Sequence, residues 1–299
     1  MRHRNRARVR SLLKALSPQD YERFQKIRIK DLGFGYDPFG LEIESAMAAF
    51  TLLQYLYKYW FRVESQGVEH VPEEGPALIT PNHSGIIPLD GAMIAIDLLK
   101  KLRNPRILRA VLYNSAGFMP FVGTFFYRCG QVSGARRNSE EVLKQGELVT
   151  VFPEGSKGTW KGFGDRYRLR PFNVGFVELS LMHEAPIVPT AVIGAEEQYP
   201  FVKNVEPLAR IFKLPYFPLS PLFPLLGPLA VLPLPTKYTL CYGEPFRFYR
   251  EYGPDAVRRP ETIRMLAGKV QRQIEAMLEE GLRNRKDIFG LSSVLGGRR

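Results

Sequence analysis

Short apolar runs separated by helical patterns are the feature of this sequence that most constrains its fold. Each run is almost continuously apolar, which is typical of strands buried on both faces of a parallel sheet. Because helical patterns separate several of the runs, their order predicts an α/β fold with a single mainly parallel sheet flanked by helices. The five runs are Ala77–Thr80, Leu108–Tyr113, Leu148–Phe152, Ile187–Ile193 and Tyr238–Tyr242.

An amphipathic pattern near the end of the chain predicts a long helix from about Glu261 to Leu282. Apolar residues recur along it at helical spacing, and packing against the core is the simplest reason for such a stripe. The stripe comprises Ile263, Leu266, Ala267, Val270, Ile274, Met277 and Leu278.

Residues 1–62 are predicted to form a basic, helical N-terminal segment, and residues 63–299 the α/β domain. The arginine run at the start is most simply a solvated tail, with attraction to anionic lipid headgroups as the alternative. Leu41–Trp60 is predicted to be a helix, but its uncharged stretch is too short to span a bilayer comfortably. We therefore expect this helix to lie in a membrane interface or to pack on the domain, and the segment to associate with membranes.

The charge balance narrows the class of partner. The 299 residues include 42 Lys and Arg against 30 Asp and Glu, a formal net charge of +12, which predicts an anionic partner. An anionic membrane surface or a phosphorylated substrate fits better than nucleic acid, because no zinc-finger, RNA-recognition or helix-turn-helix pattern is present. Two distant cysteines, Cys129 and Cys241, favour a reduced, intracellular protein, and the arginine-rich start is not followed by the apolar core of a secretory signal.

An uncharged, proline-rich segment, Leu214–Pro235, interrupts the domain. Its prolines recur every three residues, a spacing that would align them along one edge of a polyproline II helix, and their density excludes a regular membrane-spanning helix. The segment is predicted to be an apolar loop that packs over the mouth of an active site or dips into the bilayer interface. A fully buried internal loop is an equally good interpretation.

The first motif whose residue types suit catalysis is the stretch Pro81–Asp90. It follows the apolar run Ala77–Thr80 and precedes a predicted helix, Gly91–Lys100, so that His83 is expected at the carboxyl end of a strand, where open α/β sheets place their ligands. The hypothesis is a pair in which His83 is a general base and Asp90 orients the imidazole and stabilises its charged form. The alternative is a structural histidine and an aspartate that caps the helix.

A second motif follows the strand predicted at Leu148–Phe152. Glu154 is expected at the same edge of the sheet as His83, because parallel strands share direction. A carboxylate followed by Gly155 and the lysines Lys157 and Lys161 suits a polyol phosphate, although a surface turn with solvated charges would have the same sequence. The upstream loop Gly130–Arg137 ends in two adjacent arginines that could bind phosphate or simply face solvent.

Together these stretches resemble the four conserved blocks of the glycerolipid acyltransferase family related to lysophosphatidic acid acyltransferase. The first block, Asn-His followed by an aspartate, matches Asn82, His83 and Asp90; the others match Gly130–Arg136, Phe152–Ser156 and Val188–Pro189. The resemblance covers about Ala77 to Gly194. Six residues separate His83 from Asp90 where the family usually has four, so contact between them requires a loop through Gly85 and Pro88, and the chain resembles a divergent branch.

The resemblance implies transfer of an acyl group from acyl-CoA or acyl carrier protein to a hydroxyl of a glycerolipid or lysophospholipid, with no metal or cofactor. His83 would be the general base, oriented by Asp90, at the cytoplasmic face of a membrane. A thioesterase or hydrolase is the alternative, but no Gly-x-Ser-x-Gly elbow is present. A non-catalytic lipid-binding protein is the third interpretation. The residues implied to bind substrate are Asn82, Arg136, Glu154, Gly155, Ser156 and Lys157.

Overall fold

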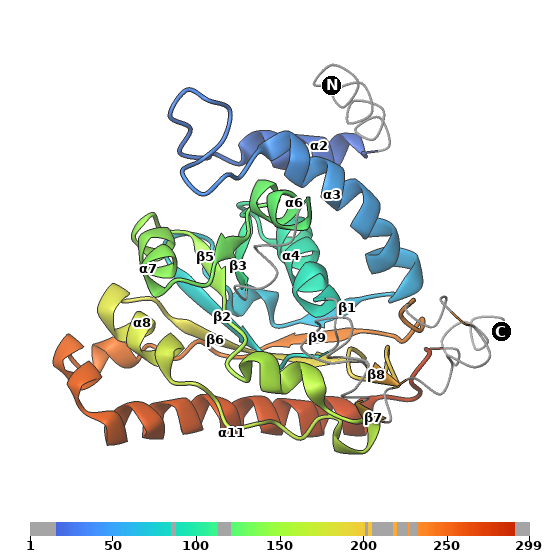
Figure 1. Ribbon diagram of the computed structural model, residues 1–299, viewed down its shortest axis with the longest axis vertical. Helices are drawn as coiled ribbons and strands as arrows, with labels where there is room; N and C mark the ends of the chain where they lie inside the picture. Colours follow the sequence, from blue (N-terminus) through green and yellow to red (C-terminus); the bar gives the residue numbers. More distant parts are fainter. Residues whose placement is uncertain are drawn as a thin grey trace.

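The computed structural model describes residues 16–84, 88–112, 121–200, 203–204, 218–219, 227 and 232–290. A seven-stranded sheet runs through the middle of the molecule, in the strand order β1-β9-β6-β2-β5-β3-β4 (Figure 1). The strands are β1 (Glu64–Gln66), β2 (Ala77–Pro81), β3 (Leu108–Leu112), β4 (Val132–Ser133), β5 (Leu148–Thr150), β6 (Ile187–Ile193) and β9 (Thr239–Tyr242).

The sheet is mostly parallel, as the sequence predicts. Strand β2 pairs in parallel with both β5 and β6, and β3 pairs in parallel with β4 and β5. The direction changes once, between β6 and β9, which are antiparallel, and β1 then runs parallel to β9. All five apolar runs form strands. The two strands of this sheet that the sequence does not predict, β1 and β4, are short and lack a continuous apolar run.

Helices cover both faces of the sheet, and the alternation of side chains along β2 shows why. Ala77 and Ile79 join an apolar cluster with helices α3 (Ile43–Tyr55) and α4 (Leu89–Lys101). Leu78, which points to the opposite face, joins a second cluster with α8 (Gly175–His183) and α11 (Pro260–Asn284). The fold therefore has three layers, with α11 below the sheet and α3 and α4 above it in Figure 1.

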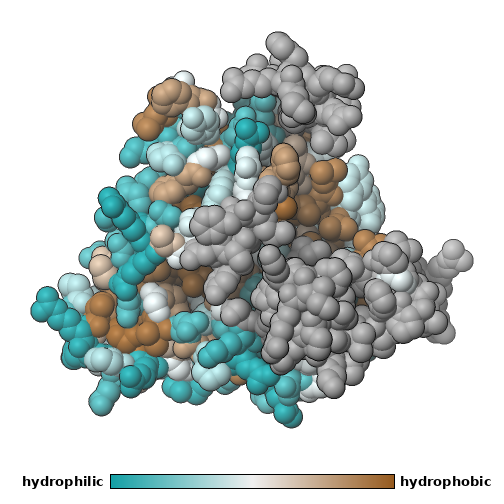
Figure 2. All heavy atoms as spheres, in the orientation of Figure 1, coloured by the Kyte–Doolittle hydropathy of each residue, from teal (hydrophilic) through white to brown (hydrophobic). Residues whose placement is uncertain are grey.

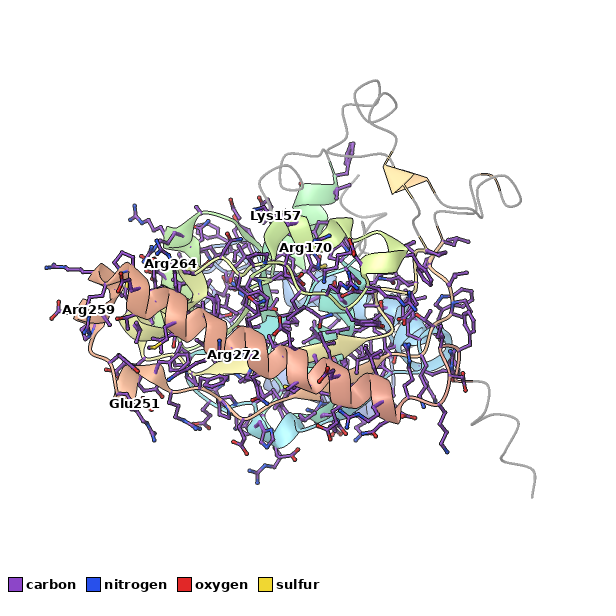
Figure 3. The ribbon with its side chains drawn as sticks, turned by 90° about the horizontal axis from the view of Figure 1, so that it is seen from below. Lys157, Arg170, Glu251, Arg259, Arg264 and Arg272 are labelled. Carbon is purple, nitrogen blue, oxygen red and sulfur yellow. The ribbon has the colours of Figure 1, made fainter. Side chains whose placement is uncertain are left out.

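Helix α11 confirms the predicted amphipathic helix. The predicted stripe faces the sheet; six of its seven residues are buried, and Met277 is partly buried. The other face carries exposed arginines, of which Arg264 and Arg272 are labelled in Figure 3, and the exposed Arg259 precedes the first turn.

The predicted helix Leu41–Trp60 corresponds to α3 and a final π-helical turn, η1 (Leu56–Trp60). A buried polar cluster ties this turn to the domain: the carboxylate of Asp97 accepts hydrogen bonds from Tyr57 (2.5 Å), Ser65 (2.9 Å) and Tyr242 (3.0 Å). Helix α2 (Pro18–Lys26) also packs on this side, through the ring of Phe24 against Phe50. Within the described ranges, no helix is long and apolar enough to cross a membrane.

The remaining described elements are short. Helices α6 (Val122–Arg128) and α7 (Arg136–Lys144) follow β3 and β4, and 3₁₀ turns occur at η2 (Val68–His70), η3 (Gly155–Trp160), η4 (Phe163–Asp165), η6 (Phe248–Arg250) and η7 (Pro254–Arg258). A separate antiparallel ladder joins β7 (Lys203–Asn204) to β8 (Pro218–Leu219). Most of the proline-rich segment Leu214–Pro235, the arginine run before residue 16 and Gly85 lie outside the described residues.

Candidate active site

His83 and Asp90 lie in direct contact, although six residues separate them. The imidazole Nδ1 is 2.7 Å from Asp90 Oδ2. Strand β2 ends at Pro81, and α4 begins after Pro88, which occupies the position before its first turn. Asp90, in the first turn of α4, thus lies beside the imidazole that follows the end of β2.

Asp90 is fully buried and held in one orientation. Besides His83, its Oδ2 accepts a hydrogen bond from the backbone N–H of Ser84 (3.0 Å), and its Oδ1 accepts one from that of Gly91 (2.8 Å). A carboxylate that accepts from Nδ1–H leaves the lone pair of the neutral imidazole on Nε2. The geometry therefore presents Nε2 of His83 as a proton acceptor.

The ring of His83 is packed rather than free to turn. Its centroid lies 4.0 Å from that of Phe152, which follows β5, and the side chain is 14% exposed. Contact with the ring of Phe152 and the hydrogen bond to Asp90 together restrict both torsions of the imidazole, so that Nε2 is preorganised.

Asn82 and Glu154 lie beneath this loop, where their polar groups are already used. Asn82 receives a hydrogen bond from Val192 N (2.7 Å) and donates to Val192 O (3.1 Å), which fastens the loop to β6. Glu154 Oε1 accepts from the backbone N–H of His83 (3.1 Å), and its Oε2 accepts from that of Arg170 (2.8 Å). Both side chains are buried, so the structure brings them to His83 from within the domain.

The turn after Glu154 contains the remaining residues of the predicted phosphate-binding stretch. Gly155 has a φ of +58°, in the left-handed region that favours glycine. Lys157 is exposed and is labelled in Figure 3. Ser156 lies in η3, and its side chain is outside what the structure describes. Lys161, in contrast, is buried in ion pairs with Glu154 and Glu196.

Arg136, the basic residue of the second block, begins α7 and is not brought to His83. Its guanidinium forms ion pairs with Glu140 (2.9 Å) on its own helix and with Glu178 on α8. An anion bound by Arg136 would therefore compete with two carboxylates.

An apolar cavity of about 150 Å³ adjoins the His83–Asp90 pair. Phe152, which stacks on His83, and Gly91, which follows Asp90, both line it. From there the cavity extends along α4, where small side chains leave room, and is closed by α3, α6 and β3. Its other lining residues include Ala46, Ala49, Phe50, Ala92, Ala95, Leu99, Ala110, Leu112, Phe125 and Phe126.

Sequence reasoning missed three contributors to this site. Phe152 stands next to a recognised motif, and its position at the end of a predicted strand was the available signal. Glu196 lies just after the predicted strand Ile187–Ile193, at the same sheet edge as His83. The spacing of Gly91, Ala92 and Ala95 places small residues on one side of α4, a pattern that leaves space beside a helix.

Comparison with known proteins identifies the family. The acyltransferase family model matches residues 62–193. A protein of Mycobacterium tuberculosis named only as uncharacterised is 40% identical over 257 residues, which cover 86% of this chain and 70% of that protein. Human 1-acyl-sn-glycerol-3-phosphate acyltransferase alpha is 29% identical over 154 residues, 50% of this chain and 51% of that protein.

The chain belongs to the glycerolipid acyltransferase family related to lysophosphatidic acid acyltransferase. It is an acyltransferase. The crystal structure of the 1-acyl-sn-glycerophosphate (LPA) acyltransferase PlsC from Thermotoga maritima has the same fold. The match has a TM-score of 0.50 at 16% sequence identity and covers 96% of this chain and 100% of that one.

Proposed function

We propose that this acyltransferase moves a fatty acyl group from acyl-CoA or acyl carrier protein to a hydroxyl of a glycerolipid or lysophospholipid. The observation that carries the proposal is the position of the apolar cavity directly beside the His83–Asp90 pair, with Phe152 shared between them. A proton acceptor next to an apolar space suits transfer of an acyl group to an alcohol.

His83 would act at Nε2. It takes the proton of the acceptor hydroxyl while the oxygen forms a bond to the thioester carbonyl carbon. Asp90 stabilises the imidazolium that results. When the tetrahedral intermediate collapses, the carbon–sulfur bond breaks and the imidazolium returns the proton to the departing sulfur, so that a free thiol and an ester are released.

The acyl chain of the donor would lie in the apolar cavity along α4. Each methylene moved from water into such a site contributes about 0.8 kcal/mol, so the part of the chain that enters the cavity adds to the affinity for the donor. Gly91 marks the end nearest the thioester, since it adjoins Asp90 and its Cα faces the Phe152 ring; a Cβ there would lie 3.3 Å from Phe152 Cζ.

The acceptor would approach from the side of η3. Lys157 is the exposed cation of this stretch and is proposed to contact an acceptor phosphate, together with the backbone at Gly155 and Ser156. Arg136 would join only after exchanging a carboxylate partner. Asn82 and Glu154 are proposed to serve substrate binding indirectly, because they fix the loop that carries His83.

The enzyme is proposed to act from the cytoplasmic face of a membrane, attached peripherally through α3 and α6. Both helices line the cavity, and both carry exposed aromatic side chains, such as Tyr55 on α3 (53% exposed) and Phe125 on α6 (49% exposed). Figure 2 shows apolar side chains gathered along α3. An acyl chain would then enter the cavity from the interface.

The test of the proposed reaction is transfer of label from radioactive acyl-CoA to a panel of lysophospholipids, glycerol phosphate and diacylglycerol. Labelled lipid formed by the wild type and by His183→Ala, but not by His83→Ala, is the expected result and names the acceptor. His183 is the matched histidine control, because its Nε2 has no hydrogen-bond partner and it ends α8, away from the site. Label released as free fatty acid in a His83-dependent reaction would show a hydrolase instead.

Membrane attachment is tested by sedimentation with vesicles that contain anionic phospholipid. Recovery of the protein with the vesicles is expected, with a loss of binding in Tyr55→Glu/Tyr59→Glu, whose rings are both exposed. Protein that stays in the supernatant at every vesicle concentration would contradict it.

A further inference from the structure

Lys161 is a buried lysine with two carboxylate partners. Its side chain is 3% exposed, and its Nζ lies 2.9 Å from Glu154 Oε2 and 3.0 Å from Glu196 Oε1. Both carboxylates are themselves buried. Because an uncompensated charge is costly inside a protein, these three side chains depend on one another. We refer to Lys161, Glu154 and Glu196 as the Lys161 cluster.

The Lys161 cluster holds the two consecutive residues at the centre of the first block. Glu154 Oε1 accepts a hydrogen bond from the backbone N–H of His83 (3.1 Å), and Glu196 Oε1 accepts from Asn82 Nδ2 (3.3 Å). Each glutamate therefore joins Lys161 to one residue of the loop that presents the imidazole.

The other oxygens of the two glutamates fix the cluster to the surrounding chain. Glu154 Oε2 accepts from the backbone N–H of Arg170 (2.8 Å), and Glu196 Oε2 accepts from that of Tyr167 (2.6 Å). Neither carboxylate can turn away from the loop without losing a backbone hydrogen bond. The cluster is thus a rigid support and has no oxygen spare for a substrate.

Close packing places the segment that carries Lys161 against His83 itself. A Cβ at Gly158 would lie 3.2 Å from His83 Cβ and 2.8 Å from Glu154 Cβ, so the glycine is needed for this approach. A shift of the segment would be transmitted to His83 through direct contact as well as through hydrogen bonds.

We propose that Lys161 is a positioning residue for His83, acting through Glu154 and Glu196 to hold the loop where the imidazole meets the acceptor hydroxyl. This inference rests on the proposed function of His83 as general base. Lys161 follows the third block, Phe152–Ser156, in the sequence. The role proposed for it concerns the rate of transfer rather than substrate binding.

Removal of the Lys161 charge would leave Glu154 and Glu196 as neighbouring buried carboxylates. The groups that donate hydrogen bonds to them are the backbone N–H groups of His83, Tyr167 and Arg170 and the amide of Asn82, and Lys161 is the cation between them. The next titratable groups are Asp90, bound to the ring of His83, and Glu197, bound to the hydroxyl of Tyr167. Burial raises the pKa of Glu196, and Lys161 opposes this rise. Two carboxylates without that cation would share a proton at low pH and repel each other at high pH.

The experiment compares Lys161→Met with Lys237→Met, a control that removes a partly buried lysine paired with Glu64 at 2.7 Å on the far edge of the sheet. Acyl transfer by Lys161→Met is expected to show kcat lowered about 100-fold, with KM for the donor unchanged, because a misplaced base slows the chemical step. The ratio of its kcat to that of the wild type is expected to fall as the pH rises. Lys237→Met is expected to retain wild-type kcat.

A second variant separates positioning from a loss of folding. Lys161→Met/Glu154→Gln removes the lysine charge and the charge of one of the two glutamates, so that Glu196 no longer faces a second carboxylate. The amide oxygen still accepts from His83 N, and kcat is expected to recover about tenfold relative to Lys161→Met. Glu154→Gln alone, which keeps Lys161 paired with Glu196, is expected to fold and to lose about tenfold in kcat.

Wild-type kcat in Lys161→Met would overturn the inference, as would a lower kcat with no pH-dependent ratio and no recovery in the double variant. His83→Ala distinguishes this failure from that of the proposed function. If His83→Ala is inactive while the lysine variant is normal, only the role of Lys161 is wrong; if His83→Ala is fully active, the proposed function itself is wrong.

Discussion

Ala95→Phe tests whether the cavity along α4 receives the acyl chain. Gly91, Ala95 and Leu99 line the cavity in succession along α4. At a rise of about 1.5 Å per residue, Leu99 lies about 12 Å along the helix from Gly91, which is at the His83 end, and Ala95 lies about halfway. Ala95 is only partly buried because it borders this space, so a phenyl ring can occupy the cavity without displacing packed side chains.

The size of the effect on kcat/KM follows from the number of acyl-chain methylenes that the phenyl ring excludes from the cavity. If the ring excludes about four methylenes, at about 0.8 kcal/mol each, long donors lose about 3 kcal/mol of binding, or about 200-fold in kcat/KM. A donor whose acyl chain ends before Ala95 keeps its wild-type kcat/KM. The expected result is therefore a change in preference from long to short chains.

The assay is kcat/KM for hexanoyl-, decanoyl- and palmitoyl-CoA with one acceptor. Ala48→Phe is the matched control, because Ala48 lies on α3 and is partly exposed outside the lining of the cavity. An equal loss for every donor, or no loss for palmitoyl-CoA, would refute the assignment of the cavity to the acyl chain.

Two further substitutions and one labelling experiment test the catalytic pair, the buried Asp97 cluster and the burial of Cys129. Asp90→Asn is expected to lower kcat about 10⁴-fold with folding retained, because an amide does not fix the Nδ1–H tautomer or stabilise the imidazolium; a loss below tenfold in the transfer assay would contradict this. Asp97→Ala is expected to lower the free energy of unfolding by about 3–5 kcal/mol in urea titrations. The reason is that Tyr57, Tyr242 and Lys101 lose their buried partner. A change under about 1 kcal/mol would show that this cluster does not stabilise the fold. Burial, with a smaller contribution from Glu42, raises the pKa of the Cys129 thiol to about 12. A thiol reagent at about pH 8 is therefore expected to label Cys129 slowly in the folded protein and fast in the urea-unfolded protein. Equal labelling rates in the two states would contradict the burial of this thiol.

The sequence was sufficient where a signal is local. Ile187–Ile193 is apolar except for Thr190 and forms a strand with the predicted bounds, whereas β4 has only two residues and no periodicity to detect. The contact of His83 with Asp90 could be expected because the intervening glycine and proline permit a tight loop.

The surroundings of His83 depend on contacts that no local pattern contains. Lys161 was expected near a phosphate, but its partners lie 7 and 35 residues away, and the second of them becomes a neighbour only when β6 pairs with β2. The cavity likewise requires α3 and α6 to pack over the small residues of α4. Tertiary packing, rather than propensity, decides both features.

The most direct test of the central claim is a single-turnover measurement, with enzyme in excess over labelled palmitoyl-CoA and the acceptor present. Wild type, His83→Ala and His183→Ala are compared, and the label on the protein is measured when the acceptor is omitted. Direct transfer with His83 as the base predicts a rate about 10²–10⁴-fold lower in His83→Ala, an unchanged rate in His183→Ala and no label on the protein. Transfer at the wild-type rate by His83→Ala, or stoichiometric acylation of the enzyme without acceptor, would contradict direct transfer with His83 as the base.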